Sequence, residues 1–261
     1  MLTDEEVRRI ADELAEAGRT RVPVPLISPR HPGMSVEDAY AVQRIWRDRA
    51  IDSGRRMVGR KIGLTSKVMQ VATGITEPDY GVIFDDMVHE SGAVIPFDAF
   101  SSVRIEVELA FVLEHALEGP DASIEDALAA TRHVVPALEI LDSRIEMDGR
   151  TIVDTISDNA AMGAMVVGGP GVRVDTVDLR WVAAVLARNG DIEESGVSAA
   201  VLGHPAAGVA WLANRLAPHG DRLEAGDIIL AGSFTRPMWV SRGDTVSADY
   251  GTLGVVECRF E

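Results

Sequence analysis

The chain has 261 residues, of which 46% are hydrophobic and 25% are charged, as in an ordinary globular protein of one large domain or two small ones. Its net charge of −16 argues against nucleic acid and anionic membranes as partners, and any anionic substrate must be held by local positive charge. The sequence has neither a signal-peptide pattern nor an apolar run of the roughly 20 residues that a membrane span needs. We therefore expect a cytoplasmic protein.

The N-terminal part of the chain is predicted to be helical. Thr3–Glu6 has the pattern of a capping box, and apolar residues follow it at helical spacing as far as Gly18. Ser35–Asp38 begins a second helix, which ends by Gly54. The four prolines of residues 20–33 predict an irregular segment between the two helices.

From Met57 onward, short apolar runs alternate with Gly, Pro and Asp, which is the pattern of many short strands. These runs cover residues 57–64, 93–96, 103–113, 133–141, 163–168, 182–189, 227–231, 237–241, 245–249 and 253–260. Only two helices interrupt them, one after Ser123 and one at about residues 205–216. The pattern predicts an α+β protein with a mostly β core that forms a rolled or barrel-like sheet. We divide the chain into a helical N-terminal subdomain, residues 1–55, and a β catalytic domain, residues 56–261.

Two glutamates lie two residues apart in the alternating run Arg104–Phe111, so Glu106 and Glu108 point to the same face of the predicted strand. A third, Glu139, lies in another apolar run, Val134–Leu141. Three converging carboxylates repel one another unless a cation lies between them or one holds a proton. Without a nearby His or Cys, they suit Mg²⁺ or Mn²⁺ better than zinc. The alternative is an exposed strand face with ordinary surface glutamates.

A lysine, Lys61, lies between apolar residues in a predicted strand that ends in glycine and hydroxyl groups. Near three carboxylates and a metal ion it would stay protonated and could bind a substrate oxygen. The alternative is a lysine on an edge strand, where its charge blocks pairing with another strand.

The sequence Glu77–Gly81 has the composition of a turn, because proline fixes φ, aspartate forms an Asx turn and glycine permits positive φ. Asp79 is then either a plain turn former or a carboxyl on a loop over the pocket, where it could transfer protons.

The polar segment Asp154–Gly163 ends in small residues that would let another backbone or a ligand approach closely. It is equally consistent with a plain polar turn before a strand.

The stretch Gly232–Pro237 follows a predicted strand and contains a glycine, two hydroxyl groups and an arginine. Ser233, Thr235 and Arg236 could together bind a substrate carboxylate. The alternative is a solvated turn in which Arg236 pairs with a surface acid and contributes little.

Taken together, these motifs resemble the hydratase–decarboxylase branch of the fumarylacetoacetate hydrolase superfamily. The resemblance runs from about residue 33 to the C-terminus. The motifs that carry it are Lys61–Ser66, Glu77–Gly81, Arg104–Glu108, Pro136–Glu139, Asp154–Ala160 and Gly232–Pro237. Some members of the branch have a serine where this chain has Ala161, so any role of that hydroxyl must lie elsewhere here.

The resemblance implies a mixed β-roll of the fumarylacetoacetase C-terminal type with a helical N-terminal portion. It implies Mg²⁺ or Mn²⁺ held by Glu106, Glu108 and Glu139, and a homo-oligomer that can associate with a related decarboxylase or hydratase. We expect Lys61 and Asp79 to be catalytic, and Lys61 to hold the 2-oxygen of the substrate.

The activity implied is a hydro-lyase of aromatic catabolism that adds water to a 2-hydroxy-2,4-dienoate or 2-oxo-4-enoate diacid. Ser233, Thr235 and Arg236 lie in the stretch that points to the seven-carbon dicarboxylate, 2-oxo-hept-4-ene-1,7-dioate. The alternatives are a 4-oxalocrotonate-type decarboxylase, a 2-oxopent-4-enoate hydratase, an acylpyruvate hydrolase and a non-enzymatic partner of a related subunit.

Overall fold

The computed structural model describes residues 1–67, 70–71 and 74–261. The α-helices of these residues are α1 (Asp4–Thr20), α2 (Val36–Asp52), α4 (Ile124–Ala130), α5 (Ile152–Ser157) and α6 (Pro205–Leu216). None of the helices in the described part of the chain is both long and apolar enough to cross a membrane.

The strands are short, apart from two long ones in the middle of the chain. They are β1 (Met57–Gly63), β2 (Asp79–Phe84), β3 (Val88–Glu90), β4 (Ala93–Ile95), β5 (Arg104–Leu113), β6 (Thr131–Leu141), β7 (Met162–Val167), β8 (Ala183–Arg188), β9 (Asp191–Val197), β10 (Ile228–Leu230), β11 (Met238–Trp239), β12 (Thr245–Asp249) and β13 (Val255–Phe260).

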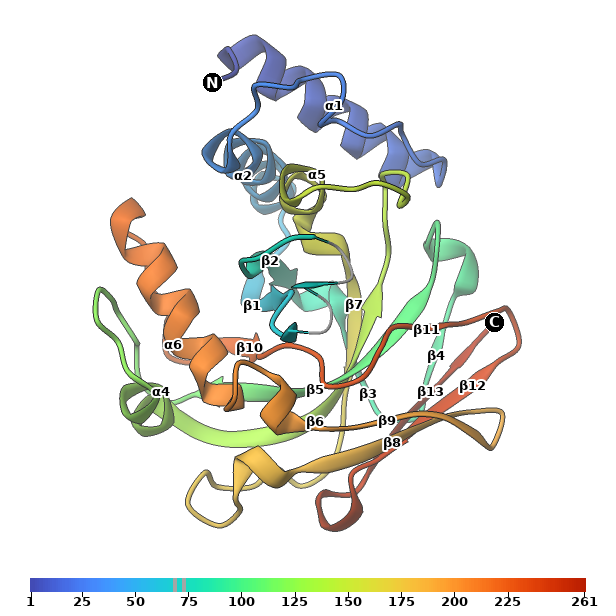
Figure 1. The fold of residues 1–261 in the computed structure, drawn as a ribbon. Coiled ribbons are helices and arrows are strands. Elements are labelled where there is room, and N and C mark those ends of the chain that lie inside the picture. The colour runs from blue at the N-terminus through green and yellow to red at the C-terminus, as the bar shows by residue number, and fades with distance from the viewer. Residues whose placement is uncertain (68–69, 72–73) are drawn as a thin grey trace.

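The strands form two mixed sheets (Figure 1). The larger sheet has the order β2-β1-β10-β5-β6-β7-β3, and β11 pairs with one end of β5. The smaller sheet has the order β4-β13-β12-β8-β9. The predicted α+β class, a mixed β-roll with a helical N-terminal portion, is confirmed.

The smaller sheet packs against the long strands of the larger one. Val246, Val256 and Phe260 of the smaller sheet are fully buried in the same apolar cluster as Val107 and Leu109 of β5. At this contact the hydroxyl of Tyr250 lies 2.9 Å from the carbonyl oxygen of Glu108 and 2.6 Å from that of Ala137. Because Glu108 and Ala137 face each other in the β5–β6 ladder, one buried side chain supports both strands at the same register position.

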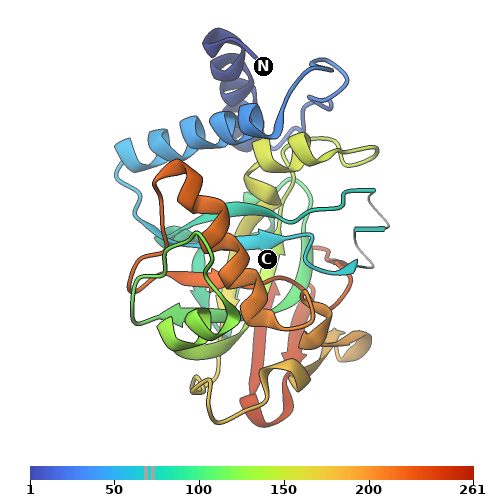
Figure 2. The same ribbon diagram turned by 60° about the vertical axis from the view of Figure 1, so that its left-hand side comes forward.

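Helix α6 lies across the face of the larger sheet (Figure 2). Its Gly208 permits this close approach, because a Cβ there would lie 2.7 Å from the carbonyl oxygen of Ala231. Helices α1 and α2 lie at the end of the molecule opposite the smaller sheet, where α2 packs against both α1 and α5 (Figure 1). Both begin with the predicted capping boxes, at Thr3 and at Ser35. The domain boundary at residues 55 and 56 stays a prediction.

Several local predictions are wrong. Residues 79–84 form a strand, β2, where turn chemistry predicted a loop, because they pair along the whole length of β1. Helix α5 occupies part of the segment that was consistent with a plain polar turn. Strand β9 was missed because its residues Asp191–Val197 are mostly polar and exposed. Helix α1 ends at Thr20, two residues after Gly18, with Arg21 in the left-handed conformation.

One buried aspartate ties the N-terminal segment to the catalytic part of the chain. Asp154, fully buried at the start of α5, accepts hydrogen bonds from the backbone of Ile27 and from the backbone and hydroxyl of Ser28, at 2.7–2.9 Å. It also accepts two from Thr151, each at 2.9 Å. Burial alone would raise the pKa of this carboxyl, but the hydrogen bonds lower it below its ordinary value.

We predict that Asp154→Asn destabilises the protein by about 3 kcal/mol at neutral pH. The amide NH₂ of asparagine would replace one carboxylate oxygen, so hydrogen-bond donors would face another donor instead of an acceptor. Since the folded-state pKa is lowered, the stabilisation is complete above the ordinary pKa of about 3.9 and is lost as the pH falls through the lower folded value. Urea unfolding at pH 7 and below pH 4 measures both effects.

Asp175→Asn is the matched control, because Asp175 is exposed and pairs with Arg173 on the surface. It should shift the urea midpoint very little. An equal shift for both variants, or an Asp154→Asn defect that does not shrink in acid, would contradict the anchoring role.

Candidate functional site

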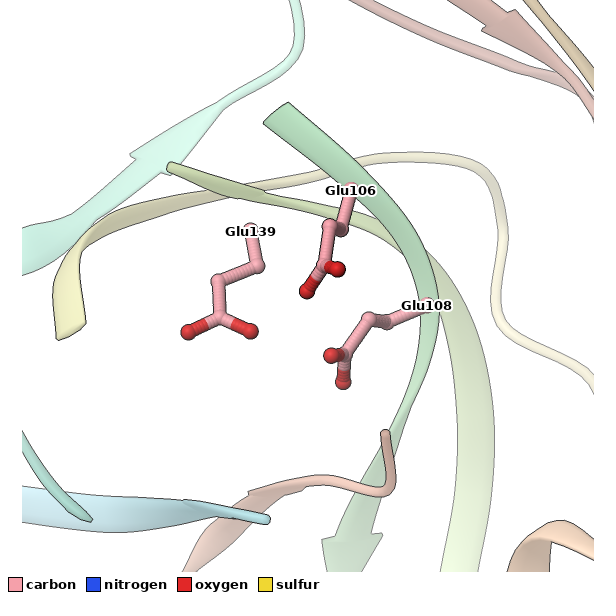
Figure 3. A group of neighbouring side chains, drawn as sticks. All are labelled: Glu106, Glu108 and Glu139. Atoms are coloured by element: carbon pink, nitrogen blue, oxygen red, sulfur yellow. The ribbon is translucent and has the colours of Figure 1, made fainter. Parts of the chain in front are cut away.

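Three glutamates meet inside the larger sheet. Glu106 and Glu108 come from β5 and Glu139 from β6, and one carboxylate oxygen of each lies within 4.8 Å of those of the other two. Figure 3 shows the three side chains pointing into one common space. Their residues are 9%, 1% and 0% exposed, so the interpretation as ordinary surface glutamates is wrong.

The β5–β6 register brings them together, because Glu106 lies directly opposite Glu139 in the antiparallel ladder. Like charges in that position destabilise a sheet. Burial, followed by the charge of Glu139, raises the pKa of Glu106 to about 7, and the same two causes raise the pKa of Glu108 well above its ordinary value. The three carboxylates therefore need a nearby positive charge to offset their mutual repulsion.

The donor set of this cluster fits a hard divalent cation. Glu108 Oε2 accepts a hydrogen bond from the backbone N–H of Gly232 at 2.8 Å. Glu108 Oε1 and both oxygens of Glu139 are buried and accept no hydrogen bond from the described residues, although Glu139 Oε1 forms an ion pair with Lys61. Buried carboxylate oxygens are normally satisfied, so the unused oxygens here are available as ligands. Ligation of a metal ion by this cluster stays a prediction.

The glycine at position 232 is required by its surroundings. Its φ of +116° lies in the region that favours glycine, and a Cβ would lie 2.1 Å from the hydroxyl oxygen of Thr65. Only a residue without a side chain can bring this backbone N–H so close to Glu108.

Lys61 reaches the same space from β1. Its Nζ lies 3.1 Å from Glu139 Oε1 and donates a hydrogen bond of 2.9 Å to the carbonyl oxygen of Ala160. In the sheet order, β10 and β5 separate β1 from β6, which in a flat sheet would hold β1 and β6 roughly 14 Å apart. The contact is made because the sheet curls. The edge-strand interpretation of Lys61 is wrong, since β1 is paired on both sides.

Lys61 is 3% exposed, and burial by itself lowers the pKa of an ammonium group. The carboxylates around it, Glu139 first and Asp79 next, outweigh burial and raise its pKa above the ordinary value. Lys61 is therefore a fixed positive charge in the site.

The carbonyl that holds Lys61 lies in a strained segment. Asn159, Ala160 and Ala161 all have positive φ, at 52°, 50° and 59°, which costs about 1–2 kcal/mol for each non-glycine residue. The side chain of Asn159 stabilises this conformation by bonding both the N–H and the carbonyl of Val82 on β2, at 2.8 and 3.0 Å. The sequence indicated a close backbone approach here but not this carbonyl.

Asp79 is the first residue of β2 and lies opposite Gly63 of β1. It is 2% exposed and lines the same cavity as Lys61. A Cβ on Gly63 would lie 2.2 Å from Asp79 Oδ1 and 3.3 Å from Lys61 Nζ, so both charged groups border the space beside that glycine. The prediction of a loop carboxyl is wrong about the element, while the proton-transfer role stays a prediction.

The hydroxyl groups of Ser233 and Thr235 support the backbone next to the glutamates. Ser233 Oγ donates to the carbonyl of Thr235 at 2.9 Å, and Thr235 Oγ1 accepts from the N–H of Val107 at 3.2 Å. Ser233 lines the cavity with Lys61, whereas Thr235 lines the neighbouring hollow. Their predicted contact with substrate stays a prediction.

Arg236 points away from the glutamates. Its side chain is 72% exposed and pairs with Glu194 Oε1 at 2.8 Å. It borders the same neighbouring hollow as Thr235 and not the cavity that contains Lys61 and Glu106. The structure thus brings Arg236 together with Thr235 but not with Lys61, Asp79 or the three glutamates.

The cavity over the glutamates has a volume of about 370 Å³ and includes two arginines that sequence reasoning did not single out. Arg104 lies two residues before Glu106 on the same strand face, so the period of two could have found it. Arg150 lies in the turn before α5, where no periodic pattern marks it. Burial, and then the charge of Arg150, lower the pKa of Arg104.

Comparison with known proteins agrees with this geometry. The chain is 51% identical to 2-oxo-hept-4-ene-1,7-dioate hydratase of Escherichia coli over 257 residues, or 96% of each chain. It is 36% identical to a 4-oxalocrotonate decarboxylase of Pseudomonas sp. (strain CF600), covering 99% of this chain and 98% of that one. The structure superposes on a 4-oxalocrotonate decarboxylase from Pseudomonas putida G7, complexed with magnesium and adipate, with a TM-score of 0.97 at 34% identity, covering 100% and 99% of the two chains.

The family model described as fumarylacetoacetate (FAA) hydrolase C-terminal matches residues 64–261, which include β2 and all later elements. With most of the chain matched by the model and nearly all of it by relatives at this identity, the chain belongs to the fumarylacetoacetate hydrolase C-terminal family.

Proposed function

We propose that this chain is a divalent-metal-dependent hydro-lyase that converts 2-oxo-hept-4-ene-1,7-dioate, through its 2-hydroxy-2,4-dienoate tautomer, to 4-hydroxy-2-oxoheptanedioate in aromatic catabolism. The observation that carries the proposal is the buried carboxylate cluster with Lys61 beside it in a cavity. The 51% identity to a hydratase of this dicarboxylate supports the choice of reaction over that of the less similar decarboxylases.

In the proposed site, Glu106, Glu108 and Glu139 hold one Mg²⁺ or Mn²⁺. Their unused buried oxygens support this assignment, as does the absence of His and Cys from the cluster found among the described residues. When bound, such an ion supplies positive charge that stabilises an enolate oxygen next to a carboxylate.

Lys61 would hold the 2-oxygen of the substrate and stabilise the negative charge that develops there, because its ammonium group is buried, fixed and protonated. With that charge stabilised, the 2-hydroxyl group of the dienol loses its proton as C5 gains one, and C4 of the resulting 3-en-2-one becomes open to addition. We assign to Asp79 the removal of a proton from the water whose oxygen bonds to C4, and the gain of a proton at C3 balances that loss as the 2-ketone re-forms.

A homo-oligomeric assembly, association with a related hydratase or decarboxylase and a cytoplasmic location stay predictions for this chain. The diacid substrate is supported by the adipate in the similar decarboxylase structure, since adipate is itself a linear dicarboxylate.

Removal of the metal ion should abolish activity, and addition of Mg²⁺ or Mn²⁺ should restore it. Glu139→Gln should weaken binding of Mn²⁺ at least ~100-fold, as followed by calorimetry, because it removes one of three charged ligands. Glu16→Gln, an exposed residue of α1, is the control and should bind Mn²⁺ like the unchanged protein. Full activity of rigorously metal-free protein would refute the metal dependence.

Replacement of Lys61 tests its role in binding developing charge. The chain has a second lysine, the exposed Lys67, which provides a matched control. Lys61→Met should lower kcat/KM by at least ~100-fold without weakening Mn²⁺ binding, because the variant lacks the ammonium group that stabilises the negative charge developing on the substrate during the reaction. Lys67→Met should leave both nearly unchanged. Near-normal turnover by Lys61→Met would remove Lys61 from the mechanism.

The product identifies the reaction. Pure protein with metal ion is incubated with 2-hydroxyhepta-2,4-dienedioate, and separately with 4-oxalocrotonate and 2-hydroxypenta-2,4-dienoate, and products are followed by NMR. We expect 4-hydroxy-2-oxoheptanedioate to form fastest. Faster release of CO₂ from 4-oxalocrotonate would favour the decarboxylase, and faster turnover of the five-carbon acid would favour the 2-oxopent-4-enoate hydratase.

A further inference from the structure

The cavity over the glutamates is lined by chemically different charged groups. Lys61, Asp79 and Glu106 line it, and so do the two arginines Arg104 and Arg150. We propose that Arg104 and Arg150 bind the second carboxylate of a linear dicarboxylate whose 2-oxo acid end lies at the glutamate cluster. This inference rests on the proposed function and names the residues that select a diacid.

Arg104 is placed for this role by β5. It shares a strand face with Glu106 and Glu108, so one face of this strand carries a positive group and two negative groups. The residue is 9% exposed, and its Nε has no hydrogen-bond partner among the described residues. A buried guanidinium with an unused donor is suited to bind a carboxylate oxygen.

The guanidinium of Arg104 is held in position without being neutralised. It lies over the ring of Trp239 on the paired strand β11, 5.4 Å from the ring centre. The acids that act on it electrostatically are Glu106, then Glu139 and then Asp142, and Asp142 also accepts hydrogen bonds from the backbone N–H groups of Ser101 and Ser102. Within the described residues, no carboxylate lies within 4 Å of the Arg104 nitrogen atoms.

Arg150 brings a second positive charge to the same part of the cavity. It is partly exposed, and the one polar contact of its side chain with the described residues is a weak one, 3.5 Å from Nη1 to Ser143 Oγ. Asp148, which also lines the cavity, does not pair with it, and in the described chain Arg150 has no ion-pair partner. Arg104 and Arg150 therefore repel each other unless an anion lies between them. This local positive charge stands out in a protein whose net charge is −16.

Part of the cavity wall is apolar. Leu141 and Met147 line it together with Pro237. Such a wall suits the carbon chain of a dicarboxylate, which has no polar group between its reacting end and its second carboxylate.

Arg236, which the sequence suggested for this task, is less suited to it. Its charge is already balanced by Glu194, and its side chain is largely exposed outside the cavity. Exposed ion pairs of this kind contribute little, and the same residue provides a matched control.

The test compares Arg150→Gln with Arg236→Gln. Calorimetry with Mn²⁺ present measures the binding of 2-oxoheptanedioate, a saturated diacid, and of 2-oxopentanoate, which lacks the second carboxylate. Arg150→Gln should weaken diacid binding roughly 10- to 100-fold and leave monoacid binding within about twofold, because one charge-assisted contact is lost. Arg150→Lys should recover part of the loss, and Arg236→Gln should change neither.

The inference is overturned if Arg150→Gln weakens both acids equally, or if the diacid-selective loss follows Arg236→Gln instead. Because binding does not require turnover, a protein that binds the diacid through Arg150 but forms no hydroxylated product would overturn the proposed function and leave this inference intact. If the unchanged protein hydrates the dienedioate but Arg150→Gln binds the diacid as tightly as the unchanged protein does, the proposed function stands and this inference is overturned.

Discussion

Three buried carboxylates that face one another are the constraint on which the rest of the structure depends. Their repulsion is set by the β5–β6 register, which places Glu106 directly opposite Glu139. The neighbouring elements counter it: the curled sheet brings in Lys61, and the turn after β10 adds the N–H of Gly232. The site is therefore a property of the curled sheet, because Lys61, Glu139 and Gly232 are far from Glu106 and Glu108 along the chain.

The strained segment before β7 has a related function in the architecture. Its left-handed residues turn the carbonyl of Ala160 toward Lys61, and Asn159 fixes that turn by pairing with β2 as another strand would. Unfavourable backbone conformations persist where the surrounding structure determines them, and they concentrate at functional sites. Here the strain positions a cation by means of a backbone oxygen, without adding a further charge.

The sequence was most informative where local periodicity and chemistry agree. A period of two was enough to place Glu106 and Glu108 on one face, and the capping boxes marked where α1 and α2 begin. It failed where long-range pairing decides the outcome: Asp79 has turn neighbours but lies in a strand because β1 pairs with it. The position of Arg150 in the cavity could not be predicted from the sequence, because only folding brings its turn to a cavity whose lining includes residues of β5 and β6.

The residues that line the cavity come from elements that are built differently, and this difference bears on how such proteins can diverge. The glutamates and Lys61 lie on paired strands beside a strained turn, and their groups depend on one another, so a change there disturbs several contacts at once. Residues 147–150 form an exposed turn with one weak backbone hydrogen bond, from Arg150 to Met147 at 3.5 Å. New substrate lengths and charges can therefore arise by drift in that turn while the chemistry stays unchanged, so relatives with different acids are expected to differ first at these four positions.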